Sequence, residues 1–207
     1  MITTQSLLVA TRNRGKIKEL RHLLADLPFE LLGLAEFPTV AEVPETGDSF
    51  SANASLKAAG YARQTGLVAL ADDSGLEVDA LGGAPGIFSA RYAGAGAADA
   101  ERTAKLLSEL TTIPAKKRSA RFVSAVAIAD CEGQILNVSV GTCDGRIDFA
   151  PRGSGGFGYD PVFVPTGYDQ TFAELAPAIK NQISHRARAL SGASEFLRTL
   201  TIPSTAG

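Results

Sequence analysis

Short apolar runs alternate with helical patterns in the first half of the chain. The run Leu7–Ala10 is followed by polar residues and predicts a buried strand. Residues 13–26 place apolar side chains at helical spacing, with Asn13 as the expected N-cap. Residues 49–65 are rich in alanine and predict a second helix that ends at Gly66. The other elements expected in this half are strands at 29–34 and 67–71 and a loop at 35–48.

The second half of the chain favours hairpins over helix crossovers. Residues 120–130 and 135–143 are rich in β-branched and apolar residues, and the glycine-containing turn between them predicts a long β-hairpin. Because strands alternate with helices first and form a hairpin later, the order predicts an α/β fold with a long central mixed β-sheet and flanking helices. The remaining expectations are a helix at 99–110 capped by Asp99, a strand at 161–164, a helix that starts at the Thr171–Glu174 capping box, and a final helix at 184–201.

No linker, repeat or low-complexity segment divides the 207 residues. The chain is therefore expected to form a single domain over 1–207, whose two lobes would share a sheet, with 202–207 as a frayed tail. Cys131 and Cys143 are expected to be free thiols in a reducing compartment. Without a secretory leader or an apolar run long enough to span a bilayer, the expected location is the cytoplasm, with no membrane partner.

The net charge of −2 conceals an uneven distribution along the chain. Basic residues predominate in 1–35 and in 180–198, whereas acidic residues predominate in 36–82. A chain of this charge is not expected to bind a nucleic acid polymer, which needs a strongly basic surface. The charged stretches are either solvated faces or a cleft in which basic ends hold a polyphosphate and an acidic middle holds a divalent cation.

The junction between the first strand and the first helix is a candidate phosphate site. A strand-to-helix turn directs free backbone N–H groups and the positive end of the helix dipole toward an anion. The segment is not a Walker A loop, because Ala10 and Ile17 stand where that motif needs glycine and serine or threonine. The candidate phosphate ligands are Thr11, Arg12, Asn13, Arg14, Gly15 and Lys16.

Three carboxylates and one lysine form a candidate catalytic group. Asp72 and Asp73 come at the end of a predicted buried strand, where α/β proteins gather their ligands. Side chains alternate along a strand, so one aspartate could bind a metal while the other serves as base or orients a lysine. Glu45 can bring another carboxylate to the metal. Lys57, on the alanine-rich helix, is either a snorkelling surface residue or a cation aimed at this site.

Two later segments are candidates for binding a flat ligand. Residues 153–160 place glycines around Phe157, which offers a stacking face. His185 and Arg186, with Lys180 nearby, supply donors suited to the acceptor atoms of a base.

Taken in order, these segments resemble the inosine/xanthosine triphosphate pyrophosphatase family. The matching pieces run from residue 11 to 186: Thr11–Lys16, Glu45–Gly47 with Phe50 and Asn53, Leu56–Lys57, Asp72–Gly75, Leu81–Gly86 with Ser89–Tyr92, Gly155–Asp160 and Ser184–Arg186. The resemblance implies two lobes around a nucleotide cleft, a homodimer, and Mg²⁺-dependent cleavage of a purine nucleoside triphosphate between the α and β phosphates. The expected substrates are ITP, dITP and XTP, and the expected products are the nucleoside monophosphate and pyrophosphate.

The resemblance also implies roles for single residues. Thr11–Lys16 and Lys57 would hold phosphates, Glu45 and Asp73 would bind Mg²⁺, and Ser74 would contact the substrate. Asp73 is the proton acceptor by resemblance, with Asp72 or a metal-bound hydroxide as alternatives. The residues implied to hold and read the base are Phe157, Gly158, Tyr159, Asp160, Lys180, His185 and Arg186.

Two other functions stay open at the level of sequence. A related pyrophosphatase acting on pyrimidine or methylated nucleotides would use similar phosphate and metal groups. A non-catalytic nucleotide sensor would not need paired carboxylates beside a phosphate site.

Overall fold

A six-stranded sheet runs through the computed structural model, which describes residues 5–200. Its strand order is β2-β1-β3-β4-β5-β6. β1 is parallel to both β2 and β3, whereas β6 is antiparallel to β5, so the predicted mixed sheet is confirmed. The strands are β1 Gln5–Val9, β2 Phe29–Gly33, β3 Ala69–Val78, β4 Ser119–Ala129, β5 Ile135–Ile147 and β6 Phe163–Pro165. The predicted hairpin corresponds to β4 and β5.

Two compact units make up the chain. Unit 1 falls within Met1–Asp73, Ala125–Val140 and Ala187–Gly207, and unit 2 within Ser74–Ser124 and Gly141–Arg186. Strands β3, β4 and β5 each contribute residues to both. The predicted tail at 202–207 lies outside the described residues.

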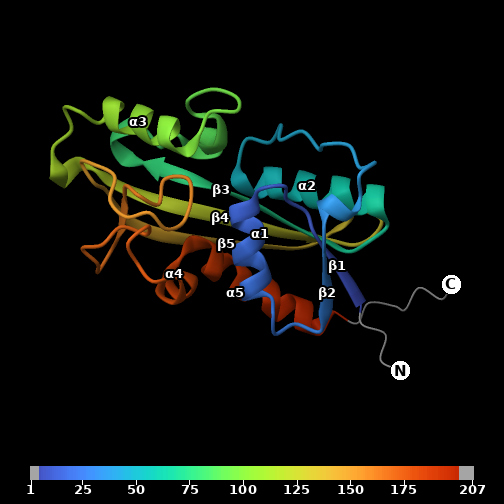
Figure 1. Cartoon of the computed structure of the whole chain (residues 1–207). Helices are drawn as coiled ribbons and strands as arrows, with labels where there is room; N and C mark the ends of the chain where they lie inside the picture. Colours follow the sequence, from blue (N-terminus) through green and yellow to red (C-terminus); the bar gives the residue numbers. More distant parts are fainter. Residues whose placement is uncertain (1–4, 201–207) are drawn as a thin grey trace. The chain divides into compact units, whose positions relative to one another are not determined.

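Unit 1 contains helices α1 (Arg14–Leu23), α2 (Phe50–Thr65) and nearly all of α5 (His185–Thr199). The apolar sides of α1 and α5 share one core with β1 residues Leu7 and Val9. Figure 1 shows α2 on the opposite side of the strands from α5. Ala54, Ala58 and Ala62 of α2 are completely buried, and their small side chains let a helix lie close to its neighbours.

Local signals set both ends of these helices. The side chain of Asn13 caps α1 by accepting a hydrogen bond from the Lys16 N–H group, as predicted. Gly66 ends α2 in the left-handed conformation, which glycine adopts without strain.

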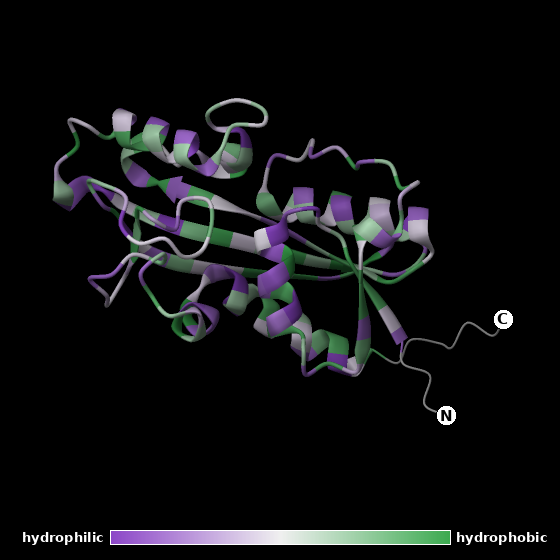
Figure 2. Ribbon diagram, in the orientation of Figure 1, coloured by the Kyte–Doolittle hydropathy of each residue, from purple (hydrophilic) through white to green (hydrophobic). Residues whose placement is uncertain are grey.

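Unit 2 contains α3 (Asp99–Glu109) and α4 (Pro177–Ile183), which lie on opposite sides of its strands (Figure 1). Leu106 and Leu110 join a core with Phe122, Phe163 and Phe172. Short 3-10 turns complete the chain at Leu34–Glu36, Asp79–Leu81, Gly86–Arg91 and Ala115–Lys117. In Figure 2, α1 and α5 show alternating hydrophilic and hydrophobic bands, as expected of helices with one face in a core.

Several boundaries differ from the sequence prediction, including the end of β5, which continues to Ile147 and does not stop at Cys143. β3 does not end at Ala71 but continues to Val78, because Leu76 and Val78 extend the buried pattern into the core of unit 2. Asp99 is the first residue of α3 and not its N-cap, which is Ala98.

The Thr171–Glu174 segment forms a turn, and the next helix starts only at Pro177. The capping-type bond from the Thr171 N–H group to Glu174 is present at 2.8 Å. The burial of Phe172 and Leu175 in the core holds this segment as a turn.

Among the helices within residues 5–200, none combines the length and the apolar character that crossing a bilayer would require.

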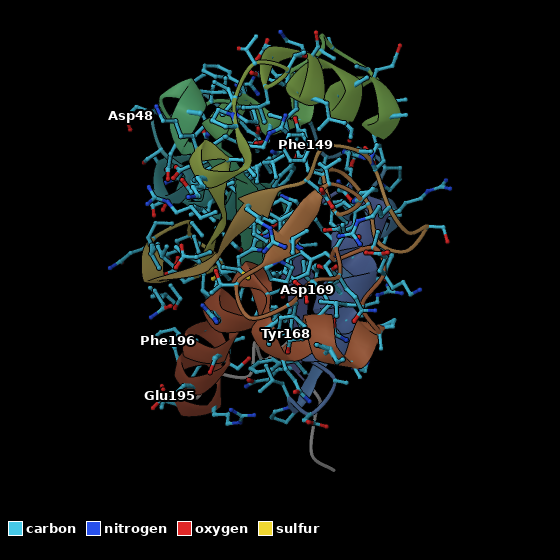
Figure 3. All side chains as sticks on the ribbon, turned by 90° about the vertical axis from the view of Figure 1, so that its left-hand side faces the viewer. Asp48, Phe149, Tyr168, Asp169, Glu195 and Phe196 are labelled. Atoms are coloured by element: carbon cyan, nitrogen blue, oxygen red, sulfur yellow. The ribbon has the colours of Figure 1, made fainter. Side chains whose placement is uncertain are left out.

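Arg118 ties three segments of unit 2 together. Its side chain is buried and donates to the backbone carbonyls of Leu110, Ile113 and Asp148 at 2.7–3.0 Å. The exposed ring of Phe149 (Figure 3) covers the guanidinium at 4.1 Å. The residue therefore satisfies carbonyls at the end of α3 and in the segment after β5.

Replacing Arg118 by methionine should lower the free energy of unfolding by about 3 kcal/mol, because three carbonyls lose a charged donor. Urea denaturation followed by circular dichroism measures this change. The exposed Lys116→Met is the matched control and should cost less than about 0.5 kcal/mol. Equal losses in both variants would show that Arg118 does not hold these segments.

Candidate active site

The ammonium group of Lys57 is the centre of a charged cluster in unit 1. The side chain comes from α2 and is largely buried. Its Nζ atom donates to Glu45 Oε1 at 2.7 Å, to Asp73 Oδ1 at 2.9 Å and to the carbonyl of Asp72 at 3.0 Å. Lys57 is therefore a cation aimed at the carboxylates and not a snorkelling surface residue.

Helix α2 also holds the loop that carries Glu45. Asn53, one turn before Lys57 on the same helix, accepts a hydrogen bond from the Gly47 N–H group at 2.8 Å. A side chain at Gly47 would approach Ala52 and Asn53 to within 3.0 Å, so only glycine fits there without displacement. One helix thus sets the positions of both Lys57 and Glu45. Asn53 and Lys57 lie four residues apart on α2, a spacing that places both side chains on one face of a helix.

The two consecutive aspartates contact different lysines. Asp72 is buried and pairs with Lys16 of α1, with 2.8 Å between Asp72 Oδ2 and Lys16 Nζ. Asp73 pairs with Lys57. Both aspartates therefore pair with a lysine, whereas the sequence pattern predicted this of at most one of them.

The other residues of the Thr11–Lys16 segment do not share the environment of Lys16. Thr11 accepts from the Asn13 N–H group at 3.2 Å, and Arg12 donates to the carbonyl of Val40 at 3.2 Å. Arg14 is exposed. Lys16 is thus the member of this segment that reaches the aspartates of β3.

The cluster is tuned by opposing effects of burial and charge. Burial raises the pKa of Asp73 above its usual value, and the positive charges of Lys57 and Lys16 only partly oppose this. Burial would lower the pKa of Lys57, but the charges of Asp73 and Glu45 outweigh it and raise the pKa. Lys57 therefore stays protonated at neutral pH, while Asp73 is a stronger proton acceptor than a free aspartate.

Two carboxylates, those of Glu45 and Asp73, are available to hold a metal ion at this site, and this small number suits Mg²⁺. Within residues 5–200, no group of three or more histidines, cysteines, aspartates or glutamates could hold a metal ion. Glu45 and Asp73 nevertheless converge on one cation, the Lys57 ammonium. Mg²⁺ typically takes one or two carboxylates and completes its shell with substrate phosphates and water, so these residues suit it.

A second cluster, in unit 2, surrounds the ring of Phe157. The ammonium of Lys180 lies 5.0 Å from the ring centroid, and the guanidinium of Arg186 lies 5.6 Å from it. Lys180 also donates to Asp160 Oδ2 at 2.5 Å. The same carboxylate oxygen accepts from the Phe157 N–H group at 2.8 Å. Asp160 therefore fixes both the backbone of Phe157 and the cation over its ring.

Arg186 and His185 are almost completely buried. Arg186 donates to the hydroxyl of Ser74 at 2.7 Å. The imidazole of His185 stacks on Phe122, with 4.6 Å between centroids and 10° between planes. Phe122 is thus a support for His185 that sequence reasoning did not find, because an apolar strand residue carries no sign of its ring partner.

Tyr159 has a different environment from the other predicted base-binding residues. Its ring belongs to the core of unit 2, and its hydroxyl donates to the carbonyl of Ser89 at 2.9 Å. The structure thus groups Lys16, Glu45, Lys57, Asp72 and Asp73 in unit 1. In unit 2 it groups Ser74, Phe157, Asp160, Lys180 and Arg186, with Tyr159 beneath the loop.

Replacing Lys16 by methionine should lower the free energy of unfolding by about 3 kcal/mol, because a buried carboxylate loses its cation. Adding Asp72→Asn to this variant should restore most of the loss, since the charge that needed the cation is gone. The exposed Lys18→Met is the control and should change stability by less than about 0.5 kcal/mol. Urea denaturation measures all three variants, and a Lys16→Met value equal to that of Lys18→Met would contradict the pairing.

Comparison with known proteins adds independent information. Residues 7–196 match the Ham1 family. The dITP/XTP pyrophosphatase of Desulforamulus reducens is 50% identical over 196 residues, which cover 95% of this chain and 97% of that protein. The Mycobacterium bovis protein of the same name is 48% identical over 203 residues, covering 97% and 98%. A HAM1 protein structure from Coxiella burnetii has a TM-score of 0.85 and 43% identity, covering 95% of this chain and 100% of its own. With nearly the whole length matched in sequence and in structure, this chain belongs to the Ham1 family.

Proposed function

We propose that this chain hydrolyses non-standard purine nucleoside triphosphates, namely ITP, dITP and XTP, to the nucleoside monophosphate and pyrophosphate. Relatives that are about half identical over nearly their full length carry the name dITP/XTP pyrophosphatase. The structural observation that carries the proposal is the convergence of Glu45 and Asp73 on the buried ammonium of Lys57. A nucleotide sensor would not need this desolvated arrangement of opposite charges.

Hydrolysis of a phosphoanhydride depends mainly on charge neutralisation and on an attacking water held in line. Lys16 and Lys57 are the cations of the unit 1 cluster, and in this proposal they hold the phosphates. The N-terminal end of α1 adds backbone N–H groups and the positive end of the helix dipole. Asp72 orients Lys16 through their ion pair.

Glu45 and Asp73 are the residues that would hold Mg²⁺, which would neutralise phosphate charge and lower the pKa of water. Asp73 is the proposed proton acceptor, since burial raises its pKa and so its affinity for a proton. Lys57 keeps the two carboxylates in place before the substrate binds.

Base recognition is assigned to the cluster of unit 2. Phe157 would stack on the purine, and Lys180, His185 and Arg186 would supply donors. Hypoxanthine and xanthine carry an oxygen acceptor at position 6, where adenine carries an amino donor. Donors facing adenine would lose their partners, and such a mismatch can reduce kcat/KM for the adenine nucleotide by several powers of ten.

We further propose that the chain forms a homodimer, as the resemblance implies, and that it works in the cytoplasm. Sedimentation equilibrium of the full chain tests the dimer directly.

A substrate panel tests the proposed function. With Mg²⁺, dITP and XTP should be turned over at least about 100-fold more efficiently than dTTP or dATP, because only the former present the 6-oxo purine. Release of pyrophosphate rather than phosphate identifies the cleaved bond. Equal or better turnover of dTTP, or of a methylated nucleotide, would favour a related pyrophosphatase. Binding without any turnover would favour a sensor.

Asp73→Asn should lower turnover of dITP by at least about 1000-fold, since it removes both a metal ligand and the proton acceptor. Affinity for dITP, measured by isothermal titration calorimetry, should stay within about tenfold, because the lysines and the base-binding residues remain. Asp48→Asn is the control: Asp48 is exposed and labelled in Figure 3, and its variant should keep wild-type kinetics. Near-normal turnover by Asp73→Asn would refute both roles.

A further inference from the structure

Helix α3 holds the peptide group next to Phe157. Asp99, the first residue of α3, accepts a hydrogen bond on Oδ2 from the Gly158 N–H group, with 2.6 Å between the atoms. One turn later on the same helix, Thr103 makes a long 3.5 Å hydrogen bond from its hydroxyl to the Gly158 carbonyl. Both polar groups of Gly158 are therefore bonded to side chains of a helix about 55 residues earlier in the chain.

Two consecutive N–H groups of the glycine-rich loop are thus bonded to carboxylates. Asp160 accepts from Phe157, and Asp99 accepts from Gly158. Hydrogen bonds to carboxylates are about twice as strong as those between neutral groups. Gly158 has a φ of +61°, a left-handed conformation that glycine adopts without strain. The ring of Phe157 projects from this doubly held backbone.

Asp99 is itself positioned by Arg102. The guanidinium forms an ion pair with Asp99 Oδ1 and donates to the carbonyls of Ala90 and Ala97 at 2.9 and 2.7 Å. The Asp99 carboxylate therefore has one oxygen directed to Arg102 and the other to Gly158. Asp99 therefore bridges Arg102 and the glycine-rich loop, in addition to placing a negative charge at the start of the helix.

We propose that Asp99 is a positioning residue for base binding: by holding the Gly158 peptide, it fixes the Phe157 ring in the orientation that stacks on the purine. This inference rests on the proposed function, because it concerns the base of the same substrate. Asp99 touches neither the metal-binding carboxylates nor the lysines of unit 1 among the contacts of the described residues.

Glu101 provides a matched control. It is the other acidic residue in the first turn of α3, and it accepts from the Ala98 N–H group at 2.6 Å. Removing either residue takes one negative charge from the positive end of the helix dipole. Only Asp99 bonds to the glycine-rich loop, so a comparison of Asp99→Ala with Glu101→Ala separates loop positioning from helix stability.

Steady-state kinetics with dITP give the first measurement. Asp99→Ala should raise KM about tenfold and leave kcat within about twofold, because stacking binds the ground state and the transition state alike. Asp99→Asn keeps an oxygen acceptor and should return KM to within about threefold of wild type. Glu101→Ala should leave KM unchanged. A fall in kcat at constant KM, or the same KM increase in Glu101→Ala, would overturn the proposal.

A second measurement needs no turnover. The chain contains no tryptophan, so Phe157→Trp introduces a single tryptophan whose fluorescence reports on the stacking position. In the ligand-free protein, adding Asp99→Ala should increase acrylamide quenching of Trp fluorescence about twofold, whereas adding Glu101→Ala should not. Quenching that is unchanged by Asp99→Ala would refute loop positioning.

The two measurements keep the inference separate from the proposed function. Absence of dITP hydrolysis in the wild type would refute the proposed function, while the quenching result would still decide whether Asp99 orders the loop. Wild-type hydrolysis with normal KM and normal quenching in Asp99→Ala would refute the inference alone.

Discussion

A buried ammonium group cannot remain charged without partners, and the candidate active site of unit 1 depends on this constraint. Lys57 is held by Glu45, Asp73 and a backbone carbonyl. Each carboxylate is in turn acceptable in its buried position because the lysine is there. Asp72 and Lys16 stabilise each other's charge in the same way. Three ion pairs therefore fix the positions of Glu45, Asp72 and Asp73 in the folded chain, and the free-energy cost of desolvating these charges is met on folding rather than on binding.

The glycine-rich loop of unit 2 follows a related principle. Glycines allow the backbone conformations that the loop needs, but a glycine-rich backbone can also adopt many other conformations. Two carboxylates hold the backbone in one conformation by accepting hydrogen bonds from successive N–H groups. Asp160 lies within the loop, and Asp99 belongs to helix α3. Tyr159 anchors the same loop in the core. The loop is thus rich in glycine and yet held in position by these contacts, as a surface that stacks on a flat ligand would need to be.

Local physics accounts for the parts of the fold that sequence patterns predict correctly. The Asn13 cap, the Gly66 stop and the hairpin of β4 and β5 depend on neighbouring residues, so a short window of sequence contains the information. Two of the wrong predictions have a common cause. β3 runs past Ala71, and the turn at Thr171 does not become a helix, because burial in the unit 2 core overrides the local preference.

The sequence by itself determined the mixed α/β fold, the order of the charged and glycine-rich segments, and the family to which they point. Only the tertiary structure decided which lysine each aspartate faces, that Lys57 is buried among carboxylates, and that His185 rests on Phe122. It also showed the bond between Asp99 and Gly158. Each of these contacts joins residues from different segments of the chain. These contacts form only because of the way the helices and strands pack, and a short window of sequence does not show that packing.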